Sequence, residues 1–191
     1  ITTAIGTVNV TALNATAAAD LSNITETGTG TVSVATAASL TFTGSFPATA
    51  FTLSGAYTVT SNGSSITTGQ AMTIATDTTF ASPAADVTGK TIVATGTLSV
   101  TALAAATVLV NITGAGTISV ATSDDLTFTG SFPATAFTLS GGDTVTNNAA
   151  SITTGQAMTI SNDTTFASTA AYVTAKTITT ANGTVNVTAL N

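Results

Sequence analysis

A long internal repeat constrains this chain more than any other feature of its sequence. The segment TVSVATAASLTFTGSFPATAFTLSG at Thr31–Gly55 recurs as TISVATSDDLTFTGSFPATAFTLSG at Thr117–Gly141, 86 residues later. The match continues without a gap, and about three-quarters of some 64 aligned positions are identical. Self-similarity at a fixed period is the signature of a repeat architecture. We therefore predict one continuous fold that consists of a partial preceding repeat at 1–30, a first repeat at 31–116 and an incomplete second repeat at 117–191.

A shorter period lies inside the long repeat. Pairs of apolar residues recur at intervals of about 19 to 26 residues, which is the length of one coil of a solenoid. Further apolar positions follow each pair after about eight and about 14 residues, so each interval has room for three short strands. We expect the first members of these pairs to stack in an apolar ladder that contains Val32, Phe51, Met72, Leu98, Ile118, Phe137 and Met158.

The local pattern favours strands. Apolar residues alternate with threonine in LTFT at 40–43 and in MTIA at 72–75, which places the two kinds of side chain on opposite faces of a strand. Threonine is β-branched and suits a pleated surface. The third strand of successive coils is expected around Phe46, Ile66 and Val87.

Two all-β folds fit such a chain. One is a right-handed β-solenoid with about 21 residues and three short strands per coil. The alternative is a series of tandem immunoglobulin-like β-sandwiches of about 86 residues each. The solenoid is favoured because a sandwich has no reason to place apolar residues at the same offsets four times within one repeat.

The low content of charged residues also favours the solenoid. Only 5% of the residues are charged, and the net charge is -6. Outward side chains of a solenoid have neighbours about 5 Å above and below, so a pair of like charges in one column costs on the order of 3 kcal/mol at an effective dielectric constant of 20. Threonine, serine and asparagine can instead form hydrogen bonds along the stack.

The composition argues against several functional classes. The chain has no His, Cys or Trp and only two basic residues, so we expect no nucleic-acid partner and no disulfide framework. Its longest nearly apolar run, at 102–110, is far shorter than the roughly 20 residues of a spanning helix, so we expect no transmembrane segment. The few carboxylates are scattered, and the sequence predicts no enzyme, no cofactor and no metal site.

One pattern suggests a binding surface. If Leu40 and Val59 point into the core, the threonines beside them point outward together, and the second repeat presents the same arrangement. Regular threonine ranks of this kind are the surface that ice-binding β-solenoids present to water, and they also suit glycans. The candidate surface residues are Thr41, Thr43, Thr58, Thr60, Thr127, Thr129, Thr144 and Thr146.

The composition and repeated phrases of the sequence resemble those of known surface proteins. The phrases ATAASLTFTG at 35–44, AFTLSGAYTVT at 50–60 and ITTGQAMTIATDTTF at 66–80 resemble the Thr-, Ala- and Gly-rich β-strand repeats of very large bacterial surface proteins and filamentous adhesins. This resemblance implies secretion and an extracellular or cell-surface location, with a role as a fibre, sheath or adhesin stalk. It also implies partners that are copies of the chain itself, end to end or lateral, or other cells and surfaces.

Overall fold

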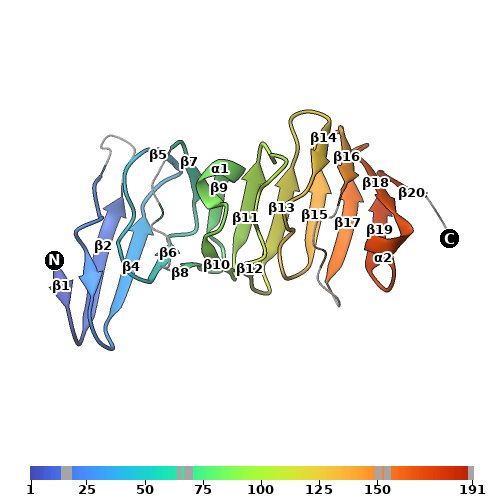
Figure 1. Cartoon of the computed structure of the whole chain (residues 1–191). Coiled ribbons are helices and arrows are strands. Elements are labelled where there is room, and N and C mark those ends of the chain that lie inside the picture. The colour runs from blue at the N-terminus through green and yellow to red at the C-terminus, as the bar shows by residue number, and fades with distance from the viewer. Residues whose placement is uncertain (14–18, 64–65, 67–70, 149–151, 153–155, 189–191) are drawn as a thin grey trace.

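The chain forms a β-solenoid. The computed structural model describes residues 1–13, 19–63, 66, 71–148, 152 and 156–188. Strands account for 52% of the chain, and they stack in parallel to give about 8 turns spaced about 20 residues apart. Figure 1 shows the coils following one another from the N-terminal to the C-terminal end of a rod. The predicted solenoid is confirmed, and tandem sandwiches are excluded because every pair of named strands is parallel.

Three sheets make up the walls of the solenoid. The first sheet has six strands, which are β2 (Thr7–Leu13), β4 (Thr31–Thr36), β6 (Phe51–Ser54), β8 (Ala71–Ile74), β10 (Thr91–Ala94) and β12 (Ile112–Thr113). The second sheet has eight strands, which are β5 (Leu40–Phe42), β7 (Thr58–Ser61), β9 (Thr79–Pro83), β11 (Thr97–Thr101), β13 (Thr117–Ala121), β15 (Phe137–Ser140), β17 (Ala157–Ser161) and β19 (Thr177–Ala181). The third sheet has four strands, which are β14 (Leu126–Phe128), β16 (Thr144–Asn147), β18 (Thr165–Thr169) and β20 (Thr184–Thr188).

The remaining elements are short. Strands β1 (Thr2–Thr3) and β3 (Thr25–Glu26) form a two-stranded sheet near the N-terminal end. The helices α1 (Ala84–Val87) and α2 (Ala170–Val173) are single turns of four residues each. Because a chain with three sides per coil needs many corners, most other described residues lie in turns.

Apolar side chains stack in ladders inside the coils. In β6 the burial alternates along the strand, so that Phe51 and Leu53 are buried while Thr52 and Ser54 are partly exposed. The neighbouring strand β8 has the same alternation and lies in register with β6. Parallel strands lie about 4.8 Å apart, so each apolar side chain has a buried neighbour above and below it.

The structure divides the expected ladder into two. Met72 pairs with Ile92 of β10, not with Leu98, which pairs with Phe80 of β9 on the second sheet. The expectation of one ladder was therefore wrong at this step. The reason is that the segment 91–101 contains two successive strands, and both carry an apolar alternation that suits a coil start.

The third side of the first coils is not a regular strand. Where the sequence predicted a strand around Val87, the chain forms α1, and Val87 is buried from this helical turn. Ser45, next to Phe46, makes only an isolated bridge to Asp20. These irregular segments still contribute to the core, because Phe46, Ile66 and Val87 are all buried.

The long repeat does not contain a whole number of coils. Strand β4 lies in the first sheet, and its equivalent 86 residues later, β13, lies in the second. Four further strands of the first sheet, β6 to β12, stand between them. One repeat therefore comprises four coils and one additional side. The same shift moves the equivalents of β5 and β7 from the second sheet to β14 and β16 of the third.

The core follows the same rotation. The ring centroids of Phe46 lie 4.6 Å from Phe42 and 5.1 Å from Phe51. The corresponding ring of Phe132 lies 4.5 Å from Phe128 and 5.1 Å from Phe137. The two aromatic clusters thus have the same internal geometry, although the strands that contribute them belong to different sheets.

Candidate functional site

The eight threonines singled out by sequence fall into two groups of four. Thr41, Thr58 and Thr60 lie on the outer surface of β5 and β7, and Thr43 follows β5. The equivalent residues lie on the outer surface of β14 and β16 or directly after β14, and they are Thr127, Thr144, Thr146 and Thr129. Each group is brought together as expected, but the first is on the second sheet and the other on the third.

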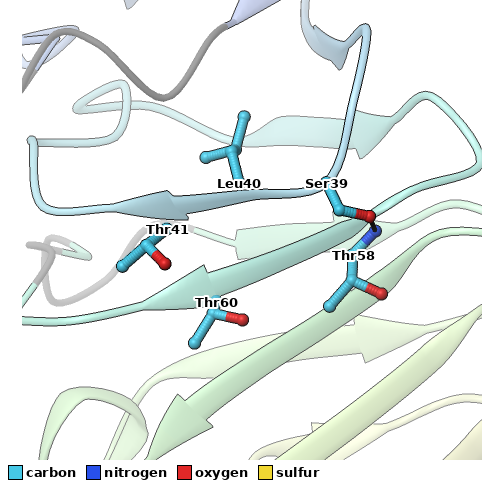
Figure 2. A pocket seen from close by; sticks show the side chains of 5 residues that line it. All are labelled: Ser39, Leu40, Thr41, Thr58 and Thr60. Atoms are coloured by element: carbon cyan, nitrogen blue, oxygen red, sulfur yellow. Dashed lines mark hydrogen bonds between the residues drawn. The ribbon is translucent and has the colours of Figure 1, made fainter.

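An open groove accompanies each group. Figure 2 shows the first groove, of about 390 Å³, which is lined by Ser39, Leu40, Thr41, Thr58 and Thr60. The second groove, of about 240 Å³, is lined by the equivalent residues Asp125, Leu126, Thr127, Thr144 and Thr146. Thr43 and Thr129 line neither groove. Both grooves offer hydroxyl groups that can donate and accept hydrogen bonds to a polar ligand or to water.

The two grooves differ in one polar group. In the first, the backbone N–H of Thr58 donates to Ser39 Oγ at 3.2 Å, a bond that is visible in Figure 2. In the second, the backbone N–H of Thr144 donates to Asp125 Oδ1 at 2.6 Å. The same link between neighbouring coils is therefore made by a hydroxyl in one repeat and by a carboxylate in the other, and of the two sets of lining residues only the second contains a negatively charged group.

The outer surface of the second sheet extends the threonine rank from β5 to β19. One column of outward side chains passes through the strand register of β5 to β19, and its members are Thr41, Thr60, Ala81, Ser99, Ser119, Thr138, Thr159 and Thr179. A parallel column contains Thr58, Thr79, Thr97 and Thr117, and later Ala157 and Thr177. Thr159 Oγ1 and Thr179 Oγ1 lie 3.2 Å apart, so neighbouring hydroxyls form a hydrogen bond along the column.

Sequence reasoning found the beginning of this rank and missed its extent. The strands β11 and β13 contribute Ser99 and Ser119, which the search for Thr-x-Thr pairs passed over. The sequence does contain a pattern for the full rank, because each coil has a threonine, serine or alanine at the same offset from its buried residues. A pattern of threonine alone does not include the central coils.

Several aspartates lie at the corners between the sides. Asp77 and Asp163 occupy equivalent turns with φ of 66° and 58°, a left-handed conformation that aspartate tolerates better than most residues. The turn before β16 contains Asp143, whose Oδ2 accepts a hydrogen bond from Thr122 Oγ1 at 2.8 Å. In the part of the chain that the structure describes, no three His, Cys, Asp or Glu residues gather in a group that could hold a metal ion.

The neighbours of Asp20 increase the acidity of its carboxyl group. Hydrogen bonds from the side chain and the backbone N–H of Ser22 hold the pKa of Asp20 below its ordinary value, and Ser45 adds a smaller effect. The backbone bond measures 3.0 Å. These contacts stabilise a corner of the solenoid and do not create a reactive group.

No helix in the described ranges has the length and apolar character needed to cross a bilayer.

Comparison with known proteins gives no relative. No protein-family model matches the chain, and neither a curated protein nor a solved structure is significantly similar to it.

Proposed function

We propose that this chain is a structural segment of an extracellular fibre, sheath or adhesin stalk, in which stacked coils provide length and stiffness. The observation that carries the proposal is the second sheet, whose eight strands form one uninterrupted parallel ladder. A solenoid transmits load through such ladders because each coil contacts only its neighbours and the core is continuous.

The surface chemistry supports the same role. The outer columns of the second sheet consist of threonine, serine and alanine, and no aspartate lies in them. A chain of such coils can be extended without accumulating rows of like charge. The resemblance to threonine- and alanine-rich repeats of bacterial surface proteins supports an extracellular location.

Two measurements test the proposal. Inserting an additional copy of 31–116 between residues 116 and 117 should lengthen the particle by about 20 Å. The copy adds four coils and one further side, and each coil lengthens the rod by about 4.8 Å. Small-angle X-ray scattering gives this length, and an insertion that adds a separate flexible bead would contradict a continuous rod. Immunogold labelling of thin sections of cells of the source organism tests the location, and label confined to the cell interior would refute it.

A second function is favoured by the threonine columns themselves. Hydroxyl and methyl groups recur at every coil of the second sheet without a charged side chain among them, which suits ordered water at an ice surface or the hydroxyl groups of a glycan. Thermal hysteresis and glycan-array binding measure these activities. No activity in either assay at high protein concentration would remove this candidate.

A further inference from the structure

We infer that the outer surface of the second sheet is a lateral contact surface for a second copy of this chain. The inference rests on the proposed structural function and adds to it which side of the rod makes the contact. For this surface we use the name lateral face, defined as the outward residues of β5, β7, β9, β11, β13, β15, β17 and β19.

The lateral face is the longest regular surface of the molecule. It is common to both long repeats, because the second strand of each coil in the first repeat and the first strand of each coil in the second repeat lie in the same sheet. The first sheet ends at β12 and the third begins at β14, so neither of them covers the full rod. A contact that uses the lateral face can therefore run from β5 to β19, which is further than on either of the other two sheets.

Its side chains are small and uncharged. In the central strands β11 and β13 the outward residues include two in-register pairs, which are Thr97 with Thr117 and Ser99 with Ser119. The aspartates in the turns beside these strands, Asp77 before β9 and Asp124 and Asp125 beyond β13, are exposed. Two lateral faces can meet without burying a carboxylate, which removes the largest cost of such a contact.

A second copy is the partner that best fits this surface. The side chains repeat every coil, at about 4.8 Å, and only a surface with the same period can interdigitate with them along the full length. Another lateral face has this period by construction. A globular protein with a mixed, charged surface would match the columns at a few positions and would leave its own charges without partners.

The size of the face predicts weak association of one segment. Seven strand spacings of about 4.8 Å give a length of about 34 Å, and two to three outward residues per strand give a width of about 12 Å. Two faces together would bury about 800 Å², which is below the roughly 1,200 Å² at the lower end of the range for stable interfaces. Association of this segment through the lateral face should therefore be weak.

Single-cysteine variants test the inference directly, because the chain has no native cysteine. Ser99→Cys lies on the lateral face, and the matched control Thr73→Cys lies on the outer surface of the first sheet; both positions are half-buried. Under a mild oxidant, Ser99→Cys should form disulfide-linked dimers about tenfold faster, a factor that corresponds to about 1.4 kcal/mol of preference. Equal rates of disulfide formation by the two variants would overturn the inference. This outcome would be expected if the lateral face binds water or a glycan, or if it binds nothing.

A charged residue provides the second readout. Adding Ser119→Lys to the Ser99→Cys variant should abolish its advantage, whereas adding Thr52→Lys on the first sheet should leave it unchanged. Circular dichroism of each variant verifies that the strands are intact. If scattering shows a rod that lengthens with an inserted repeat while the two cysteines react equally, the lateral contact is wrong and the structural function stands. If the insertion does not extend the rod, the proposed function itself fails.

Discussion

Phe51 lies directly below Met72 in the first sheet, where the two are in-register partners of β6 and β8 and both are buried. A charge placed in this ladder would have no partner above or below it. We expect Phe51→Asp to prevent folding, because burying an unpaired carboxylate costs several kcal/mol. Circular dichroism and limited proteolysis report the loss of structure. Thr41→Ser, on the exposed outer surface of β5, is the control and should leave the fold intact; a folded Phe51→Asp protein would contradict the assigned ladder.

The two aromatic clusters should respond equally to truncation. Phe46 and Phe132 are fully buried and each lies at the centre of a group of phenylalanine rings with closely matching centroid distances. Phe46→Ala and Phe132→Ala should each lower the free energy of unfolding by about 3–5 kcal/mol, the usual cost of removing a buried phenylalanine. Urea denaturation measures both values. A loss confined to one cluster would show that the repeats are not energetically equivalent.

Charges should interact strongly along a column. Ser99 and Ser119 are in-register neighbours on the outer surface of the second sheet. Two lysines at these positions should destabilise the fold by about 1–3 kcal/mol more than the sum of the single substitutions, since like charges about 5 Å apart repel by these amounts between dielectric constants of 80 and 20. A lysine with a glutamate should show coupling of the opposite sign. A double-mutant cycle in thermal or urea unfolding gives both values, and coupling near zero for both pairs would remove the electrostatic explanation for the scarcity of charge.

The turn before β14 offers a matched test of two adjacent carboxylates. Asp125 accepts the backbone N–H of Thr144, whereas in the first repeat Ser39 accepts the equivalent bond from Thr58. Asp125→Ala should cost about 1 kcal/mol, the typical net worth of such a hydrogen bond. Asp125→Ser should recover most of this loss, because it recreates the arrangement of the first repeat. Asp124→Ala is the control, with no expected loss in melting temperature; a loss as large as that of Asp125→Ala would show that charge, not the bond, matters.

Asp20 should become protonated at a lower pH than an ordinary aspartate. The pKa of Asp20 is lowered by the side chain and the backbone N–H of Ser22, so the charged form is favoured in the folded state. The resulting stabilisation is present above the ordinary aspartate pKa and is lost as the pH falls through the lowered one. Ser22→Ala should raise the pKa of Asp20 towards its ordinary value in an NMR titration. Ser33→Ala, on the outer surface of β4, should not change it.

The fold could be predicted to the level of the coil. Alternation of apolar residues with threonine gave the strands, and the recurrence of this pattern at about 20 residues gave the stacking, as Phe51 and Met72 illustrate. The step from Met72 to Leu98 failed because β10 and β11 are separated by only Thr95 and Gly96, and both have a strand pattern. Periodicity identifies candidate strands, but the spatial register decides which of two neighbours continues a ladder.

The candidate surface was only partly predictable for a related reason. Sequence identity between the repeats linked Thr60 to Thr146, which lie on different sheets, and it gave no sign that Thr60 shares a column with Ser99 and Ser119. Residues that look equivalent in sequence are related by the repeat. Residues that are equivalent in space are related by the coil, and the two relations coincide only when a repeat contains a whole number of coils.

The mismatch between repeat and coil gives an extended array a screw-like character. Strand β4 and its equivalent β13 differ by four coils and one side, so each successive repeat turns its pattern by one side of the rod. Three repeats in succession would return the pattern to its starting side after about thirteen coils. In a stalk with this construction, a feature that occurs once per repeat appears on each of the three sides in turn. A molecule that contacts any one side therefore finds the feature there once every three repeats.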